Sequence, residues 1–371
     1  MSGNYLQRPS RSFLLLLAAA IFSVALRWLL PATFIENWFS RGWFQWWRSI
    51  WDNLVVRFVP IPLIYLFWGL VIWGLYRLIR SVIRRPKDQG WGTALLLLGH
   101  RLLRFFCWLI IAFFWLWGYN YGRLPVEEVM DFRRYSPELE DLRKYVFEEA
   151  TALANLRAQL QADDSQPIRR DLFPEDLQAE VRQLLVAALK QEGYPTAGKV
   201  RIRELWPPGI LLRWGTAGVY WPWASEGNVD GGLTALQLAP IMAHEMAHGY
   251  GFGDEGVCNF WAVLTGYQVE TPILEYAFRF DYWRRMATQL RRAQPAAYIA
   301  WRQHSLDPGI VTDLEYIYRN NQRFPDLMPR FRHAFYNTYL QVQGVREGVL
   351  SYGTVIQLVE GYKRREERIG D

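Results

Sequence analysis

The chain has 371 residues, of which 51% are hydrophobic and 16% aromatic, and its formal net charge is +6. It is too long for one average domain, and its 19 tryptophans are more typical of a chain at a membrane interface than of a soluble domain. No basic stripe interleaves with aromatic residues outside the apolar N-terminal region, which argues against nucleic-acid binding. The two cysteines, Cys107 and Cys258, argue against a disulfide framework.

The first third of the chain contains three apolar stretches, at residues 13–30, 59–79 and 95–119. Each is close to the length of about 20 residues that a helix needs to cross a bilayer. The first stretch follows Arg8 and Arg11 as a signal peptide would, but no clean small-x-small cleavage site precedes a polar segment, so an uncleaved span is favoured. Residues 1–120 are therefore predicted to form a transmembrane domain with three spans.

The distribution of charge predicts how these spans are oriented. The loop before the third stretch holds a basic cluster, made of Arg77, Arg80, Arg84, Arg85 and Lys87. Arg101 and Arg104 lie near the start of the third stretch, where long side chains can reach the cytoplasmic interface. By the positive-inside rule the N-terminus and this loop lie in the cytoplasm. Residues 121–371 then form an extracytoplasmic domain of a multi-pass cell-membrane protein.

The loop at residues 31–54 is rich in tryptophan, with Trp38, Trp43, Trp46, Trp47 and Trp51. One interpretation is a helix that lies on the outer membrane interface. The other is that these rings pack against the third span. The sequence favours neither interpretation over the other.

The remainder of the chain has the pattern of a mostly helical domain with a small β-sheet. A helix is expected from Ser136, with that serine as its cap, and another at 174–193. Strands are expected at 199–205, 210–214 and 218–223. Further helices are expected at 233–248, 255–269, 272–292, 326–343 and 352–365. The predicted fold class is mostly α: three transmembrane helices followed by an α-rich α+β domain.

A histidine pair ends the helix expected at 233–248. His244 and His248 flank Glu245 in the pattern H-E-x-x-H. Residues i and i+4 share one helix face, so both imidazoles can reach one ion. Zinc binds neutral histidine nitrogens, and Glu245 is then the expected general acid and base toward a metal-activated water. The alternative is an ordinary helix in which the two histidines are structural.

A third ligand has to come from beyond the histidine pair. On one continuous helix Glu255 would lie about 16 Å along the axis from His244, too far to share an ion. The chain must therefore turn after the second histidine. Glycine adopts the backbone conformations of such a turn without strain, and this segment has Gly249, Gly251 and Gly253.

Two acids compete for the third position. Asp254 as the ligand would resemble the metzincin arrangement. Alternatively Asp254 caps a new helix and Glu255, in its first turn, is the ligand, which resembles the glutamate-liganded zincins. The favoured assignment is Glu255, and Asn259, one turn later, is suited to support a ligand.

Other side chains are weaker candidates for a role at the site. Tyr276 and Tyr220 could each stabilise an oxyanion, although most tyrosines here are expected to pack. Glu226 and Asn228 either line the cleft or cap a turn. His304 and His333 have no partner at ligand spacing and are expected to be ordinary histidines, so neither is assigned to a site.

Nearly the whole chain resembles one family, the uncharacterised bacterial multi-pass membrane proteins with a zincin-like, gluzincin-type C-terminal domain. The resemblance is carried in order by "GYNYGR" (118–123), "GTAGVYWPWASEGNVD" (215–230), "HEMAHGYGFGDEGVCNF" (244–260), "ILEYAFRFDYWRR" (273–285) and "GVREGVLSYGTVIQLVEGY" (344–362). The central segment resembles H-E-x-A-H-x-x-G-F-x-x-E-x-x-x-N-F. The family often has a second acid where this chain has Val257, which strengthens Glu255 as the ligand.

The resemblance implies a zinc-dependent, membrane-anchored metallopeptidase of the bacterial inner membrane. Its expected cofactor is Zn²⁺, and its expected partners are the lipid bilayer and a peptide or protein substrate, membrane-proximal because the link after Tyr119 is short. The rival hypothesis is a non-catalytic membrane-anchored scaffold or sensor whose zinc site is structural or vestigial. A fourth metal position without a protein ligand would favour the metallopeptidase over the scaffold or sensor, because structural zinc sites are closed by four protein ligands.

Overall fold

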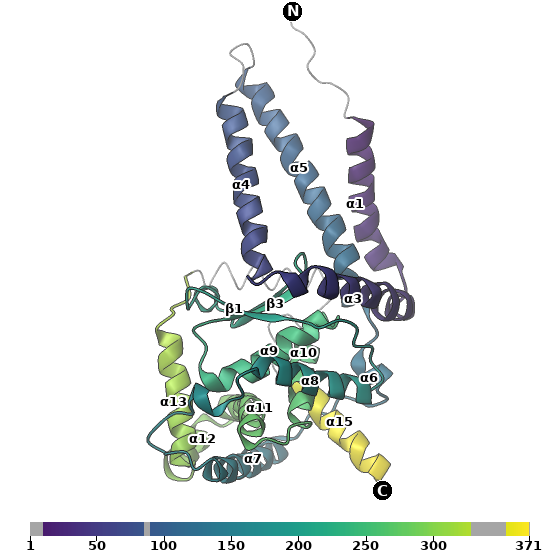
Figure 1. Ribbon diagram of the computed structural model, residues 1–371. Helices are drawn as coiled ribbons and strands as arrows, with labels where there is room; N and C mark the ends of the chain where they lie inside the picture. The colour runs from purple at the N-terminus through teal and green to yellow at the C-terminus, as the bar shows by residue number, and fades with distance from the viewer. Residues whose placement is uncertain (1–9, 85–89, 328–353, 371) are drawn as a thin grey trace, which may run out of the picture. The chain divides into compact units, whose positions relative to one another are not determined.

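The computed structural model describes residues 10–84, 90–327 and 354–370, and it is mostly helical (Figure 1). The chain divides into two compact units. Unit 1 holds the residues up to Arg123 together with residues 221–226, and unit 2 holds residues 124–220 and those from Gly227 onward. The boundary expected at residue 120 did not anticipate that residues 221–226 belong to unit 1.

Unit 1 contains three helices that are long and apolar enough to cross a membrane: α1 (Arg11–Leu29), α4 (Leu63–Ile83) and α5 (Trp91–Leu116). They confirm the three apolar stretches, with shifted ends. The second helix begins at Leu63 rather than at residue 59, because Pro62 is its N-cap and its ψ of 123° lies outside the helical region. The third ends at Leu116 and is followed by the short 3-10 helix η3 (Gly118–Gly122).

The tryptophan-rich loop is helical almost throughout. It consists of α2 (Ala32–Phe34), the π-helix η1 (Ile35–Trp43) and α3 (Phe44–Leu54), followed by the 3-10 helix η2 (Val56–Phe58). One face packs inside unit 1, where the Trp43 indole donates to the Trp115 carbonyl at 2.8 Å. Trp38 and Trp46 are each about half exposed. Packing against the third span is therefore observed, and contact of the exposed rings with a membrane interface stays a prediction.

Residues 221–226 are held within unit 1 by hydrogen bonds. Arg48 donates to the Ser225 carbonyl at 2.6 Å, and the Trp51 indole donates to the Ala224 carbonyl at 2.9 Å. The Glu226 carboxylate accepts the backbone N–H of Leu63 at 2.7 Å. Glu226 therefore satisfies an otherwise unpaired amide at the start of α4, which is a capping role.

Unit 2 is built mainly from helices that surround one hydrophobic core. In chain order these are α6 (Val126–Val129), α7 (Leu139–Gln159), η4 (Arg170–Leu172), α8 (Leu177–Gln191), η5 (Leu212–Trp214), α9 (Ala235–Gly249), α10 (Glu255–Gly266), α11 (Pro272–Ala293), α12 (Pro295–His304), α13 (Pro308–Gln322) and α15 (Thr354–Gly370). The central helix α9 packs against α8, α10 and α11. The segment with the histidine pair is thus fixed on several sides.

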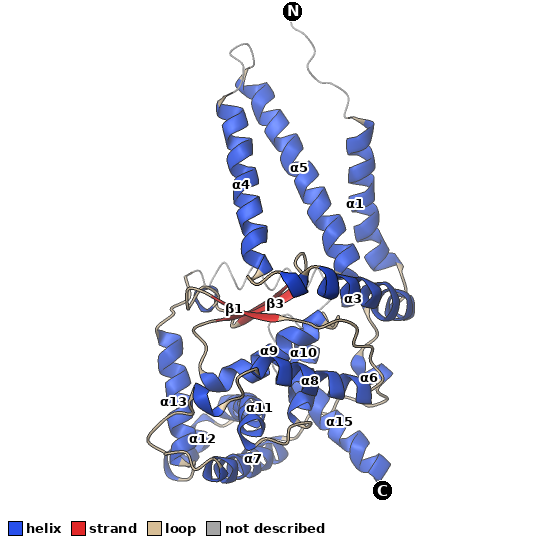
Figure 2. Cartoon of the chain, viewed as in Figure 1, coloured by secondary structure: helices blue, strands red, loops and turns tan. Residues whose placement is uncertain are grey.

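The described sheet has three strands in the order β1-β3-β2. Figure 2 shows the strands in red, with β1 and β3 labelled. They are β1 (Ile202–Leu205), β2 (Gly218–Trp221) and β3 (Glu226–Asp230), and β1 and β3 are parallel with Ile202 opposite Gly227. β1 and β2 confirm the strands expected at 199–205 and 218–223. β3 was not expected, because its sequence "EGNVD" has the residues of a turn, yet every residue in it is buried.

The strand expected at residues 210–214 is wrong. This segment forms the 3-10 helix η5 and ends at Gly215, whose φ is +70°. The cause lies in the side chain of Asp230, whose carboxylate accepts the backbone N–H groups of Gly209, Leu211 and Leu212. Three donors that converge on one carboxylate curl the backbone, so an extended strand cannot form.

The cap expected at Ser136 is also wrong. α7 begins at Leu139, and its N-cap is Glu138 without a side-chain hydrogen bond. The Ser136 hydroxyl accepts from the Gln357 side chain at 2.9 Å, and the Tyr135 N–H donates to the Gln357 carbonyl at 3.0 Å. The segment before α7 therefore pairs with α15, which the local sequence could not reveal.

Two helices, α12 and α13, were not among the expected elements. Each begins with a proline in its first turn, a position that proline favours. The helix expected at 326–343 lies outside the described residues from position 328 onward, as does His333. The last helix, α15, is described from Thr354 and agrees with the helix expected at 352–365.

Candidate metal centre

The helix α9 presents the histidine pair. Its start is fixed by a capping box, in which Thr234 and Gln237 satisfy each other's backbone amides. Buried side chains such as Met242 and Met246 anchor the helix in the core. His244 and His248 then lie on one face with their ring centroids 4.9 Å apart.

The chain turns after α9 as the glycine pattern predicted. Gly251 has a φ of +94°, a conformation that glycine adopts without strain. Gly249 is needed for a different reason: a Cβ there would overlap with the Val200 side chain. The carboxylate of Asp254 then accepts the Val257 N–H at 2.9 Å and caps α10. The turn and the cap together return the chain toward the histidines.

The return brings Glu255 to the histidine pair. Its Oε2 lies 3.1 Å from Nε2 of His244, and its Oε1 lies 3.6 Å from Nε2 of His248. One ligand atom from each of the three residues lies within 4.8 Å of the other two. Among the described residues, this is the one group of histidine, cysteine and acidic side chains that could hold a metal ion.

The two imidazoles are held by their other ring nitrogens. Nδ1 of His244 lies 2.9 Å from Oδ1 of Asn259, and Nδ1 of His248 lies 2.8 Å from the carbonyl oxygen of Phe252. Each Nδ1–H therefore donates to an oxygen, which leaves both Nε2 atoms facing Glu255, where a proton or a metal ion can lie between them and the carboxylate. Cys258, fully buried, is 3.2 Å from Nδ1 of His248 and packs against the same ring.

The geometry couples the charges of the three groups. Burial opposes the charge on Glu255, but the facing His248 lowers the pKa of Glu255 well below its usual value. Burial likewise opposes a charge on His248, but the neighbouring Cys258 and Glu255 raise the pKa of His248 well above its usual value. The Glu255 carboxylate thus favours positive charge on the facing imidazole of His248.

Glu245 lies beside this group under the sheet. Its side chain is 5% exposed, and the backbone amide of Tyr220 in β2 bonds to its carboxylate. A Cβ at Gly218 would lie 2.5 Å from its Oε1, so only glycine allows β2 to approach so closely. Its Oε2 is buried without a hydrogen-bond partner. Burial raises the pKa of Glu245 to about 6, despite the opposing effect of the two histidines.

The structure gives the remaining candidates other positions. Asp254 caps α10 and is not in the group of three. The hydroxyl of Tyr276 is fully buried and donates to Asp313 at 2.8 Å, so this tyrosine is part of the core. Tyr220 contacts Glu245 through its backbone amide, and a role for its hydroxyl stays a prediction. Asn228 lies buried in β3, and His304 bonds the Ala300 carbonyl on α12.

The sequence pattern did not predict three features of the site. Gly218 lies in the segment 215–230, which carries part of the family resemblance. Only the close packing of Glu245 against it explains why this residue is glycine. The Phe252 carbonyl that orients His248 is a backbone atom and leaves no side-chain signal. Cys258 is a buried neighbour of that histidine, which its position one turn into α10 could have suggested.

These residues fit a divalent transition metal by their chemistry. Two imidazole nitrogens and one carboxylate are a ligand set that zinc commonly takes, and catalytic zinc sites have three protein ligands. The second oxygen of Glu245, buried and without a partner, lies next to the set and not within it. The arrangement therefore combines three potential ligands with an adjacent acid that is available for proton transfer.

Comparison with known proteins gives a family but no activity. No curated protein and no solved structure matches the chain. The profile of a family described as "Protein of unknown function (DUF3810)" matches residues 39–359. These residues include most of the tryptophan-rich loop, the candidate metal centre and the start of α15. The match covers most of the sequence, and the chain belongs to the DUF3810 family.

Proposed function

We propose that the chain is a membrane-anchored zinc metallopeptidase. The observation that carries the proposal is the convergence of His244, His248 and Glu255, whose ligand atoms lie within 4.8 Å of one another. Glu245 supports it, because this acid is next to the group and has a buried oxygen without a partner. A structural site would need a fourth protein ligand, and the described residues offer three. That difference favours catalysis over the scaffold or sensor hypothesis.

The chemistry follows from the residues present. Zinc held by such a ligand set acts as a Lewis acid toward water and a peptide carbonyl. The Oε2 atom of Glu245 would accept a proton from the attacking water and later deliver it to the leaving amine. The hydrogen bonds that the two Nδ1–H groups donate to Asn259 and to the Phe252 carbonyl would keep both Nε2 atoms aimed at the metal while the substrate changes.

The strand β2 offers a place for the substrate backbone. It is an edge strand of the described sheet, and its residues Gly218 and Tyr220 contact Glu245. An edge strand has backbone groups that can pair with an extended peptide. A peptide added at β2 would thus run close to the acid that transfers the proton.

We also propose a location for the catalytic unit. The three apolar helices are suited to cross a membrane, and the basic residues between the second and third favour a cytoplasmic loop. With the N-terminus also in the cytoplasm, unit 2 is extracytoplasmic in a bacterial inner membrane. Substrates would then be peptides or proteins outside the cytoplasm and close to the bilayer.

Peptide hydrolysis by the purified full-length protein tests the proposed activity. A quenched-fluorescence peptide library should be cleaved by the wild type, and a chelator should abolish cleavage until zinc is restored. Glu245→Gln removes the proton acceptor and keeps the shape, so cleavage should fall by at least about 100-fold. Cleavage by Glu245→Gln at the wild-type rate would refute the assigned role of Glu245. Lack of cleavage by the wild type across the library would favour the scaffold or sensor hypothesis.

A further inference from the structure

One loop of unit 2 carries exposed tryptophan side chains at both of its ends. It comprises residues 206–214, with the sequence "WPPGILLRW", and follows β1. Trp206 is 64% exposed and Trp214 is 50% exposed, whereas the other tryptophans of unit 2 are buried or partly buried. Leu327, which is 58% exposed, lies beside the loop, because its backbone N–H donates to the Arg213 carbonyl at 2.9 Å. We call residues 206–214 the tryptophan knob.

The tryptophan knob is held in shape by one buried carboxylate. Asp230 of β3 is fully buried, and its carboxylate oxygens accept four backbone N–H groups at 2.6 to 3.1 Å. The donors are the amides of Gly209, Leu211, Leu212 and Gly232. The Phe324 ring fills the space under the loop, since a Cβ at Gly209 would overlap with that ring. The exposed tryptophans are therefore attached to a fixed support.

The surface of the knob is mostly apolar. Arg213 is its one charged residue, and the remainder are tryptophan, proline, glycine, isoleucine and leucine. Exposed tryptophans scattered singly would need no explanation, but two on one rigid loop with Leu327 beside them form a patch. Such a patch on a surface indicates an interaction with another apolar surface.

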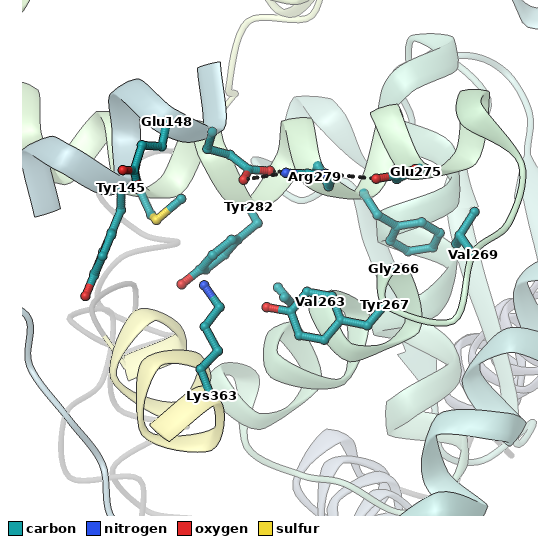
Figure 3. A pocket seen from close by; sticks show the side chains of 13 residues that line it. Tyr145, Glu148, Val263, Gly266, Tyr267, Val269, Glu275, Arg279, Tyr282 and Lys363 are labelled. Atoms are coloured by element: carbon teal, nitrogen blue, oxygen red, sulfur yellow. Dashed lines mark hydrogen bonds and ion pairs between the residues drawn. The ribbon is translucent and has the colours of Figure 1, made fainter. Parts of the chain in front are cut away.

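An exposed aromatic ring elsewhere in unit 2 has different surroundings. Tyr267, which is 47% exposed, lines a cavity of about 480 Å³ between α7, α10, α11 and α15 (Figure 3). Arg279 in this cavity is bound by Glu149 at 2.6 Å and by Glu275 at 2.8 Å. Such charged groups are costly to remove from water. That surface suits contact with water, and the tryptophan knob does not share its chemistry.

A short stretch of chain ties the tryptophan knob to the unit that holds the apolar helices. Trp221 ends β2 and belongs to unit 1, where its ring centroid lies 5.3 Å from that of Phe67 and 5.7 Å from that of Trp68. Both partners lie in the second turn of α4, which is long and apolar enough to cross a membrane. The seven residues from Trp214 to Trp221 span at most about 25 Å. The knob is thus tethered within reach of the membrane surface at which α4 begins.

We propose that the tryptophan knob binds the lipid bilayer, with Trp206, Trp214 and Leu327 in the interfacial layer. Indole rings favour this layer, because it offers apolar contact to the ring and hydrogen-bond partners to the N–H group. Lipid binding by the knob does not depend on the proposed peptidase activity.

Lipid binding by the knob has a consequence for the substrate, and this consequence rests on the proposed function. β2 begins at Gly218, four residues after Trp214 and at most about 14 Å from it. Gly218 is also the residue against which Glu245 packs. A knob in the interfacial layer would therefore hold the edge strand close to the bilayer. The favoured substrates would be peptide segments next to a membrane surface.

A fluorophore on the knob tests its contact with lipid. Full-length Trp214→Cys protein is labelled with an environment-sensitive maleimide dye and reconstituted in vesicles of phosphatidylethanolamine and phosphatidylglycerol. The native Cys107 and Cys258 are buried, so the new thiol is the reactive one. Interfacial groups lie about 5–10 Å into the headgroup region, so phospholipid with a nitroxide at that depth should reduce the emission at least about twofold. Trp206→Cys should give the same result and serves as the second variant if Trp214→Cys does not fold.

A matched position on another part of unit 2 supplies the control. Ile299 is 49% exposed on α12, which lies at the opposite end of unit 2 from β1 (Figure 1). The emission of labelled Ile299→Cys should not change with the nitroxide lipid.

Three results would overturn lipid binding by the knob. They are a dye on the knob with the emission of a dye in water, equal quenching at position 299, and an apolar emission spectrum without quenching by lipid. The last result would show that protein covers the knob. Quenching at the knob in a protein that cleaves no peptide would leave the lipid contact standing while the peptidase activity fails.

Discussion

At the scale of single residues, the site depends on hydrogen bonds that orient its imidazoles. His244 and His248 can offer Nε2 to a metal because Nδ1 is bound to Asn259 in one case and to the Phe252 carbonyl in the other. The sequence suggested Asn259 from its position one turn after Glu255. It could not suggest Phe252, because any residue type has a carbonyl. Residue spacing in the sequence can therefore suggest a side chain that accepts a hydrogen bond from a ligand, but it cannot suggest a backbone carbonyl that does so.

Replacing the Asn259 acceptor should weaken the metal site. Asn259→Leu keeps the approximate volume but leaves Nδ1 of His244 without an acceptor, so zinc affinity should fall by about 10- to 100-fold. Competition with a fluorescent zinc chelator measures the change. Asn259→Asp retains an acceptor oxygen and should bind zinc at least as tightly as the wild type. Unchanged affinity in Asn259→Leu would show that this hydrogen bond does not support the site.

Gly218 should be essential for catalysis but not for metal binding. A methyl group at this position would meet Oε1, Cγ and Cδ of Glu245 at 2.5 to 2.9 Å and would displace that carboxylate. Peptide hydrolysis by Gly218→Ala should fall about 100-fold, the order expected for a misplaced general base, with zinc content unchanged. Gly92→Ala, where a Cβ meets nothing within 4 Å, should behave as the wild type. An active Gly218→Ala variant would argue against the position given to Glu245.

At the scale of elements, the turn between α9 and α10 creates the site. The sequence predicted it, because a straight helix cannot bring His244 and Glu255 to one ion and because glycines follow the histidine pair. The structure adds that the glycines differ: Gly251 supplies a positive φ, whereas Gly249 makes room for Val200. The elements that were mispredicted are those fixed by distant partners. The 3-10 helix η5 is curled by Asp230, and the segment before α7 is paired with Gln357.

Mutation should distinguish the roles of the two acids after the turn, Asp254 and Glu255. Asp254→Ala removes the cap of α10 and should cost about 1 kcal/mol of stability while the protein still binds zinc. Glu255→Ala removes a ligand and should abolish tight zinc binding with a smaller effect on folding in the metal-free state. Thermal unfolding in detergent, with and without chelator, reports both effects. Zinc lost in Asp254→Ala but retained in Glu255→Ala would reverse the assignment of the ligand.

At the scale of the whole molecule, the chain combines three apolar helices with a mostly helical second unit. The apolar stretches were predictable because length and hydropathy suffice to identify them. The assignment of residues 221–226 to unit 1 was not predictable, because it depends on contacts such as Arg48 to Ser225, which are 177 positions apart. Membership of the DUF3810 family extends across both units, from residue 39 to residue 359.

The proposed orientation can be tested with reporter fusions. A reporter that is active only outside the cytoplasm should be active when fused after Arg123 and inactive when fused after Lys87, because the basic loop is retained inside. A reporter that fluoresces only in the cytoplasm should give the opposite pattern. Activity of the outside reporter after Lys87 would invert the topology and place unit 2 in the cytoplasm.

We propose that His244, His248 and Glu255 bind a catalytic metal that Glu245 does not ligate. The most direct measurement is the metal content of purified full-length wild-type protein and of Glu245→Gln, determined by elemental mass spectrometry. We expect equal, stoichiometric zinc in both proteins, with peptide hydrolysis lost only in the variant. Wild-type protein that contains no metal after purification and zinc dialysis would contradict it, as would zinc that is lost together with Glu245.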